Sequence, residues 1–170
     1  MAQPMQQSNL AQVNIGRLRY PVGSPKLREF TVALARINGL AEHSPGFVWR
    51  HPTEGGHIDG GELLDDPLLF INVSVWQSYE HLHDFTYRTV HGHFVRRQRE
   101  WFLPMPPPTT ALWWTPVGER PSLDQAIARL RLLRRYGPAP QAFTLRRRFD
   151  PHGRPEPRHK PRTPRPLPAS

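Results

Sequence analysis

Residues 68–102, LLFINVSVWQSYEHLHDFTYRTVHGHFVRRQREWF, constrain the fold of this chain more than any other stretch. The odd-numbered residues from 69 to 75 are all aliphatic, and this period of two predicts a β-strand over residues 68–76. Ser78 is a favourable N-cap, so we expect a helix to follow the strand directly. Because this junction brings aromatic, histidine and arginine side chains together, we expect it to line a pocket if the chain forms one.

Three further strands and two further helices are predicted from the rest of the sequence. Alternating or short apolar runs predict the strands, and apolar residues three and four apart after a serine N-cap predict the helices. The strands are expected at residues 10–17, 47–51 and 109–115, and the helices at 24–42 and between 122 and 137. Residues 52–67 are rich in glycine and acidic residues, which indicates a loop or a hairpin.

This order of elements, β-α-β-β-α-β with an extra C-terminal helix, is typical of a ferredoxin-like α+β fold. Such a fold has a four-stranded antiparallel sheet with helices on one face. Its other face would carry exposed tryptophan and phenylalanine side chains, and these need a cover. We therefore expect two protomers to pair as a homodimer that forms a dimeric α/β barrel.

Composition excludes several classes of protein. The chain has 170 residues, enough for one domain with a core, and it contains no Cys. Disulfides, thiolate catalysis and zinc–thiolate sites are therefore excluded. No run of apolar residues is long enough to span a membrane, and residues 1–10 lack the pattern of a signal peptide. A cytoplasmic protein with no membrane partner is expected.

The net charge of +9 is concentrated at the C-terminus. Residues 146–170 contain eight Lys or Arg, two acidic residues and seven prolines. We expect a frayed N-terminus over residues 1–9, one folded domain over 10–145 and a disordered, basic, proline- and arginine-rich tail over 146–170. The tail could associate with nucleic acid through charge alone, although a solubilising role is the simpler interpretation.

Several segments agree, in order, with one known family. They are SVWQSYEHLHDF at 74–85, His91, REWF at 99–102 and ALWWTPVGERP at 111–121. They resemble an uncharacterised bacterial family, domain of unknown function 3291, over residues 10–143. That family is placed in the dimeric α/β-barrel superfamily, near the antibiotic biosynthesis monooxygenases. The resemblance implies a homodimer with a pocket between sheet and helices.

The same superfamily includes haem-degrading enzymes, which use an Asn on the first strand and a Trp and a His on the second helix. Asn14 matches the Asn, and Phe85 stands at the Trp position. His91 falls about one turn before the His position. Only one of these three positions matches, which argues against haem degradation. Binding of a ligand without that reaction stays open.

The candidate site residues combine polar groups with aromatic walls. They are Asn14 and His91 as catalytic residues, and Trp76, Phe85, Tyr87, Arg97 and Trp113 as substrate-binding residues. His91 would accept a proton near neutral pH, and Arg97 would bind an anionic oxygen. The plainer interpretations are a solvated helix face for these two, and core or interface packing for the tryptophans. No set of side chains has the spacing of a metal site.

Three functions follow as alternatives. The first is a cofactor-free, monooxygenase-like oxidoreductase that acts on an aromatic or polyketide-like small molecule, since no flavin or nicotinamide motif is present. The second is non-catalytic binding of a small apolar or aromatic ligand, or of haem. The third is association with nucleic acid through the tail.

Overall fold

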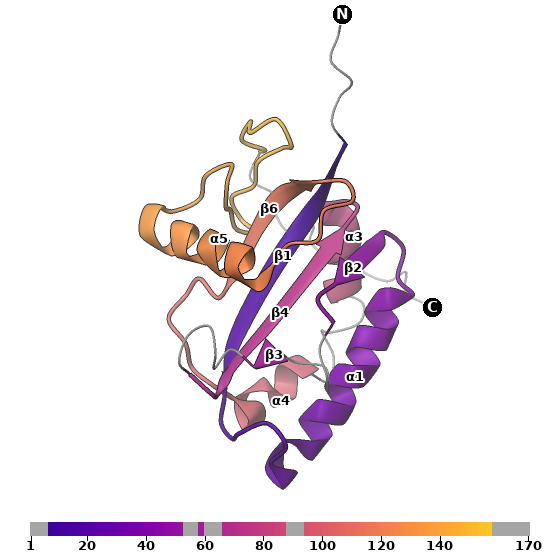
Figure 1. The fold of residues 1–170 in the computed structure, drawn as a ribbon, viewed down its shortest axis with the longest axis vertical. Coiled ribbons are helices and arrows are strands. Elements are labelled where there is room, and N and C mark those ends of the chain that lie inside the picture. The colour runs from indigo at the N-terminus through magenta and orange to yellow at the C-terminus, as the bar shows by residue number, and fades with distance from the viewer. Residues whose placement is uncertain (1–6, 53–57, 60–65, 88–93, 158–170) are drawn as a thin grey trace, which may run out of the picture.

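The structure, a computed structural model, describes residues 7–52, 58–59, 66–87 and 94–157 (Figure 1). These residues form an α+β fold around one antiparallel sheet of six strands. The strands are β1 (Ser8–Leu18), β2 (Phe47–Arg50), β3 (Ile58–Asp59), β4 (Leu69–Trp76), β5 (Phe102–Leu103) and β6 (Thr110–Pro116). The helices are η1 (Pro25–Leu27), α1 (Arg28–Glu42), α3 (Tyr79–Phe85), α4 (Phe94–Trp101) and α5 (Leu123–Tyr136).

β1 and β4 form the centre of the sheet and pair along almost their whole length. β2 and β3 pair with the outer side of β4, and β6 and β5 pair with the outer side of β1. The sheet is therefore four strands wide, with two short strands extending its edges. The predicted strands and the two outer predicted helices are confirmed at positions within a few residues of those expected.

Helix α5 covers the aliphatic face of the sheet. Its Ala126, Ile127, Leu130 and Leu133 pack on odd-numbered residues of β1 and β4, and on Ala111 and Trp113 of β6. Figure 1 shows α5 lying across the front of the sheet. These strand residues are all buried within one protomer. A capping box starts α5, in which Ser122 and Gln125 exchange reciprocal hydrogen bonds of 3.2 and 2.8 Å.

The opposite face carries α1, α3 and α4, so the prediction that helices lie on one face alone is wrong. α1 and α4 contact it through a cluster that includes Phe30, Phe70 and Trp101. α3 contacts it through Leu82 and Phe85, beside Trp76. Period-two alternation identifies the two faces of a strand, but it does not reveal that both faces are covered by helices.

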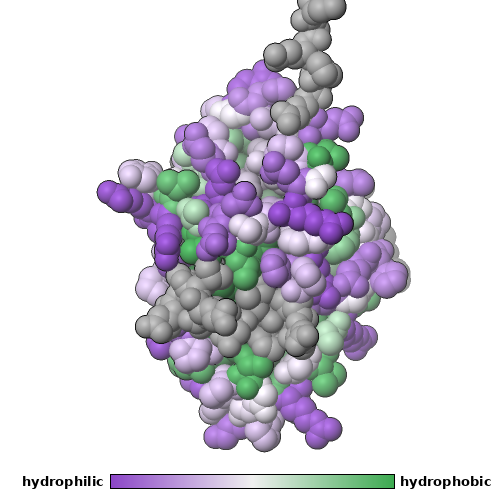
Figure 2. All heavy atoms as spheres, viewed as in Figure 1, coloured by the Kyte–Doolittle hydropathy of each residue, from purple (hydrophilic) through white to green (hydrophobic). Residues whose placement is uncertain are grey.

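The surface over α5 gives no support to the argument that led from the sequence to a dimer. In Figure 2, hydrophilic residues predominate on the side where α5 lies, and hydrophobic residues occur in small groups. The face that was expected to need a partner, which carries Phe70 and Trp76, packs against α1, α3 and α4, and α5 covers the aliphatic face. The homodimer therefore stays a prediction, and the need to cover a bare face of the sheet does not support it.

The chain packs on the fold beyond the predicted domain boundary at 145. Phe143 pairs with Leu112 at the edge of β6 through two backbone hydrogen bonds of 2.8 and 2.9 Å. Phe149 is buried against Phe143, and its carbonyl accepts a hydrogen bond of 2.7 Å from the Trp114 indole. We call residues 139–157 the C-terminal strap. Residues 146–157 are thus part of the folded domain, and the predicted tail begins too early. None of the helices in the described ranges is both long and apolar enough to cross a membrane.

Candidate functional site

A cavity of about 1450 Å³ lies between the even-numbered face of the sheet and helices α1 and α3. The sheet supplies its floor, α1 and α3 supply its walls, and the C-terminal strap reaches its rim. The volume is sufficient for a fused-ring organic molecule.

The floor of the cavity consists of two polar rows that run across the sheet. In one row Asn14 of β1 lies between Thr110 of β6 and Asn72 of β4. In the next row Gln12 of β1 lies beside Ser74 of β4. Because strand residues two apart share a face, the strand register places these five polar side chains on one surface.

The amides of the floor are not hydrogen-bonded within the part of the chain that the structure describes. Among the described residues, the side chains of Gln12, Asn14 and Asn72 have no hydrogen-bond partner. Asn14 is exposed to solvent although β1 is a central strand, because the cavity opens above it. Asn38 of α1 faces the cavity with only 6% of its surface exposed, and its amide has no partner within the described residues either. A buried amide without a partner costs about 1–3 kcal/mol.

An aromatic wall stands at the α3 end of the floor. The rings of Trp76 and Phe85 stack with their centroids 5.1 Å apart and an interplanar angle of 28°. Phe47 meets Trp76 edge-on at 5.4 Å. The Trp76 indole N–H donates a hydrogen bond of 3.1 Å to the Ser74 hydroxyl, which fixes the orientation of the ring. Trp76 is only 1% exposed, so the half-buried rings of Phe85 and Phe47 form the apolar surface of this wall beside the polar rows.

Three ionisable rings, those of Tyr79 and His83 of α3 and of Tyr87 just after it, follow one another along the cavity. The ring of His83 lies 5.6 Å from that of Tyr79 and 4.2 Å from that of Tyr87. Burial raises the pKa of the Tyr79 phenol, while the positive charge of Arg148 acts in the opposite direction. The Arg148 guanidinium lies 3.8 Å from the Tyr79 ring centroid and pairs with Glu156 at 3.1 Å. The strap is thereby joined to α3 at the cavity.

The rim of the cavity is basic. Leu145, Arg146 and Arg147 of the strap and Arg50 of β2 line it, and the described lining contains no Asp or Glu. Arg50 is paired with Glu42 at 2.7 Å. Arg146 and Arg147 have no side-chain partner among the described residues.

The structure brings four of the predicted site residues together in this cavity: Asn14, Trp76, Phe85 and Tyr87. Trp113 lies on the other face of the sheet, buried beneath α5, so its predicted contact with a ligand of this cavity is wrong. Its neighbour Trp114 lies on the opposite face of β6, because successive strand residues alternate. His91 lies outside the described residues.

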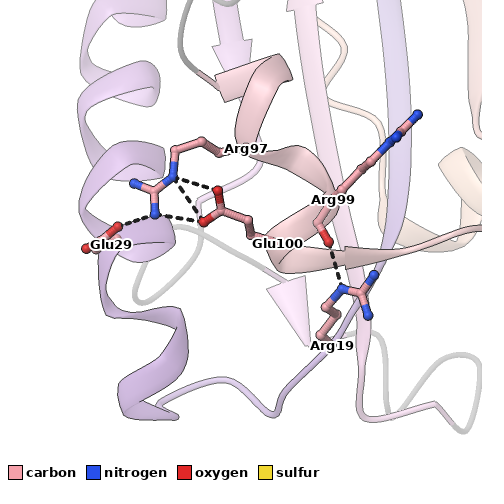
Figure 3. A network of polar contacts seen from close by, with 5 residues as sticks. All are labelled: Arg19, Glu29, Arg97, Arg99 and Glu100. Atoms are coloured by element: carbon pink, nitrogen blue, oxygen red, sulfur yellow. Dashed lines mark hydrogen bonds and ion pairs between the residues drawn. The ribbon is translucent and has the colours of Figure 1, made fainter.

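Arg97 also does not line the cavity. Its guanidinium bonds to Glu100 at 2.8 Å and to Glu29 of α1, as Figure 3 shows. Hydrogen bonds to these two carboxylates raise the pKa of Arg97, and the bond to Glu100 has the larger effect. Beside them the Arg19 guanidinium donates to the Arg99 carbonyl at 2.7 Å. This network joins α4 to α1 and to the end of β1, which gives Arg97 a structural role.

Sequence reasoning gave no site role to Gln12, Asn38, Arg146 or Arg147. The signal for Gln12 is its spacing of two from Asn14, which puts both on one face of β1. Asn38 is visible as a polar residue within the buried stripe of α1 that contains Phe30, Leu34 and Ala41. The two arginines carry no such signal, because only the packing of the strap brings them to the rim.

No metal site is formed in the described part of the chain, where no three His, Asp or Glu side chains are close enough to share an ion. A ligand of this cavity would therefore contact amides, hydroxyls, aromatic rings and arginines. These groups bind by hydrogen bonding, stacking and charge.

No curated protein matches this sequence. Two solved structures are similar to it. A protein of unknown function from Nitrosomonas europaea, NE2512, is 10% identical with a TM-score of 0.45, and the match covers 69% of this chain and 98% of that one. PA3566 from Pseudomonas aeruginosa is 9% identical with a TM-score of 0.44, and the match covers 70% of this chain and 100% of that one.

The comparison with protein families gives a match over most of the chain. The profile of DUF3291, a domain of unknown function, matches residues 9–159, which extend through the C-terminal strap. The chain therefore belongs to the DUF3291 family.

Proposed function

We propose that this protein binds a small molecule with a flat aromatic body and neutral polar groups in the cavity between the sheet and helices α1 and α3. The observation that carries the proposal is a set of four amides that face this cavity and have no hydrogen-bond partner in the described part of the chain: Gln12, Asn14, Asn38 and Asn72. Asn38 is buried, and a buried amide lowers stability unless something bonds to it, whereas Gln12, Asn14 and Asn72 are accessible from the cavity. A bound molecule with carbonyl or hydroxyl groups would supply those bonds.

The aromatic wall supports a flat shape for the ligand. Phe85 is half-buried and is held in place by its stack on the buried Trp76, so a ligand ring can pack against Phe85 without reorganising the wall. Apolar walls with a few convergent polar groups are the usual composition of small-molecule sites. The polar rows would then fix the orientation of a ring system whose face rests on the wall.

A titration with anthraquinone-2-carboxamide tests this proposal. This uncharged probe has three fused rings and two ring carbonyls that can accept from the floor amides. Quenching of tryptophan fluorescence should saturate at one probe per protomer. The double variant Asn14→Leu, Asn72→Leu should bind about tenfold more weakly, because it removes two hydrogen-bond donors.

The control is Gln141→Leu, which removes an exposed amide outside the cavity. It should bind the probe as the unmodified protein does. Saturable binding that survives the double variant, or no saturable binding in the unmodified protein, would contradict the proposal. Thermal unfolding of each variant would verify that the fold is intact.

A catalytic role is the second candidate, in which the protein is a cofactor-free, monooxygenase-like oxidoreductase. The supporting observation is His83, whose imidazole lines the cavity beside Tyr79 and Tyr87 and can accept a proton from a phenolic substrate. Oxygen consumption with hydroxylated anthracenones, lost in His83→Gln with probe binding retained, would support it. Haem is the other occupant to test, by a Soret band after haem is added.

We further propose that the sheet is ferredoxin-like and that two protomers associate. The order β2–β4–β1–β6 of the longer strands supports the first part. Since α5 covers the aliphatic face, a dimer would have to use another surface. Sedimentation equilibrium of the full chain would measure the mass, and a monomer at all accessible concentrations would contradict the dimer.

A further inference from the structure

We infer that the ligand of this cavity carries an anionic group, a carboxylate or a phosphate, at the end that faces the C-terminal strap, and that Arg146 and Arg147 bind it. The inference rests on the proposed binding function and specifies the chemical class of its ligand. Two independent observations lead to it. One is the charge of the cavity lining, and the other is the way the strap is fixed.

The cavity lining is basic at one end and uncharged at its floor. The arginines of the lining carry a permanent positive charge, and no carboxylate occurs among the described residues that line the cavity. Arg50 is neutralised by Glu42, which leaves Arg146 and Arg147 as the charges available to a ligand. Outside the cavity, Arg17, Arg97, Arg148 and Arg154 each have an acidic partner.

The strap holds these two arginines between fixed points. On one side, Phe143 pairs with Leu112 in the sheet. On the other side, Arg148 packs on Tyr79 and Phe149 accepts from the Trp114 indole. Between them the Thr144 hydroxyl accepts a hydrogen bond of 3.1 Å from the Arg147 amide, which closes a turn. Because both flanking segments are anchored, the arginines lose less freedom on binding than they would in a loose tail.

The position of Arg148 shows which way this segment faces. Its side chain is largely buried between Tyr79 and Glu156, at the α3 wall of the same cavity. The preceding arginines therefore emerge where the strap passes over the cavity and not on the remote surface. A guanidinium binds carboxylate or phosphate oxygens through charge-assisted hydrogen bonds.

Three probes with one ring system test the inference: anthraquinone-2-carboxamide, anthraquinone-2-carboxylate and anthraquinone-2-sulfonate. The carboxamide and carboxylate have nearly the same shape and differ in charge, and the sulfonate offers the tetrahedral oxygens of a phosphate. The unmodified full-length protein should bind at least one anion about tenfold more tightly than the carboxamide at low salt. This preference should shrink as salt is added. Preference for the carboxylate over the sulfonate would identify the anion as a carboxylate, and the reverse would favour a phosphate.

The double variant Arg146→Gln, Arg147→Gln should lose this preference and bind the carboxamide as the unmodified protein does. The control Arg36→Gln, Arg131→Gln removes the same charge from two exposed positions outside the cavity and should keep the preference. Equal affinity for neutral and anionic probes, or an equal loss in the control, would overturn the inference while leaving the binding function intact. Failure of all three probes to bind would overturn the binding function itself.

Discussion

Replacing Asn38 by Leu is expected to stabilise the protein and weaken its binding of ligand. Asn38 interrupts the buried stripe of α1, where Phe30, Leu34 and Ala41 pack inward. Its amide is 6% exposed and has no partner among the described residues. Leucine has a similar size, so Asn38→Leu removes a poorly solvated amide and continues the apolar stripe.

The expected gain is about 1 kcal/mol in the free energy of unfolding, the lower end of the range for an unsatisfied amide, because a little of Asn38 still reaches the solvent-filled cavity. For a chain of this size, this gain should raise Tm by about 2–4 °C. The same substitution removes one amide from the ligand, so the affinity for anthraquinone-2-carboxamide should fall about threefold to tenfold.

Differential scanning calorimetry and the fluorescence titration measure the two effects on the same samples. Asn38→Ala serves as the control, because alanine also favours a helix but does not fill the space. We expect the leucine variant to be the more stable of the two. A leucine variant less stable than the unmodified protein by 1 kcal/mol or more would refute the reasoning, since the amide would then have a structural partner.

Four further perturbations are expected to have defined effects. Phe85→Ala should weaken binding of the carboxamide probe about threefold to tenfold in the same titration, because it removes the ring stacked on Trp76. Arg148→Gln should release the strap from Tyr79 and Glu156 and speed cleavage by trypsin after Arg146 or Arg147; an unchanged cleavage rate would contradict this role. Hydrogen bonds from the Arg154 amide, and then from its side chain and the His152 amide, hold the pKa of Asp150 below its ordinary value of 3.8. The stability that these hydrogen bonds contribute is therefore present above pH 3.8 and is lost as the pH falls through the lowered pKa. A fall in the protection factor of the Arg154 amide in acid, relative to intrinsic exchange at the same pH, would report that loss, and Asp150→Asn should remove this fall. Gly46→Ala should lower the free energy of unfolding by about 1–2 kcal/mol or more, because Gly46 has φ +76° and a Cβ would overlap the His81 ring. The control Gly39→Ala, in the open part of α1, should be neutral or stabilising.

The elements of this fold were predictable because each has a local cause. β4 alternates because its odd-numbered residues pack under α5 and its even-numbered residues face the cavity, and Ser122 with Gln125 satisfies the first amides of α5. Ser78 likewise caps α3 by accepting from the His81 amide. The predicted long second helix is represented by α3 and α4 in the described residues.

The placement of the helices was not predictable, because it depends on contacts between distant segments. Trp113 alternates correctly along β6, yet only the packing of α5 decides that its face is a closed core. Arg97 shares a helical stripe with Trp101, but Glu29, far away in sequence, is what holds it. Side-chain periodicity gives the face of an element and not the identity of its neighbour.

The cavity was predictable in part. Asn14, Trp76, Phe85 and Tyr87 come from the strand and helix that the sequence identified as lining a pocket, or from the predicted first strand. The basic rim was missed because residues 146–157 have the composition of a disordered tail. Phe143 and Phe149, two large apolar residues in an otherwise polar segment, anchor it to the fold.

A titration of the ¹⁵N-labelled full-length protein with anthraquinone-2-carboxamide, followed by NMR, tests the binding site most directly. The side-chain amide signals of Gln12, Asn14, Asn38 and Asn72 should shift together and saturate at one probe per protomer. The side-chain signals of Gln125 and Gln141, which do not line the cavity, should stay in place. Shifts confined to residues outside the cavity, or no shift of the four amides at saturating probe, would contradict binding at this site.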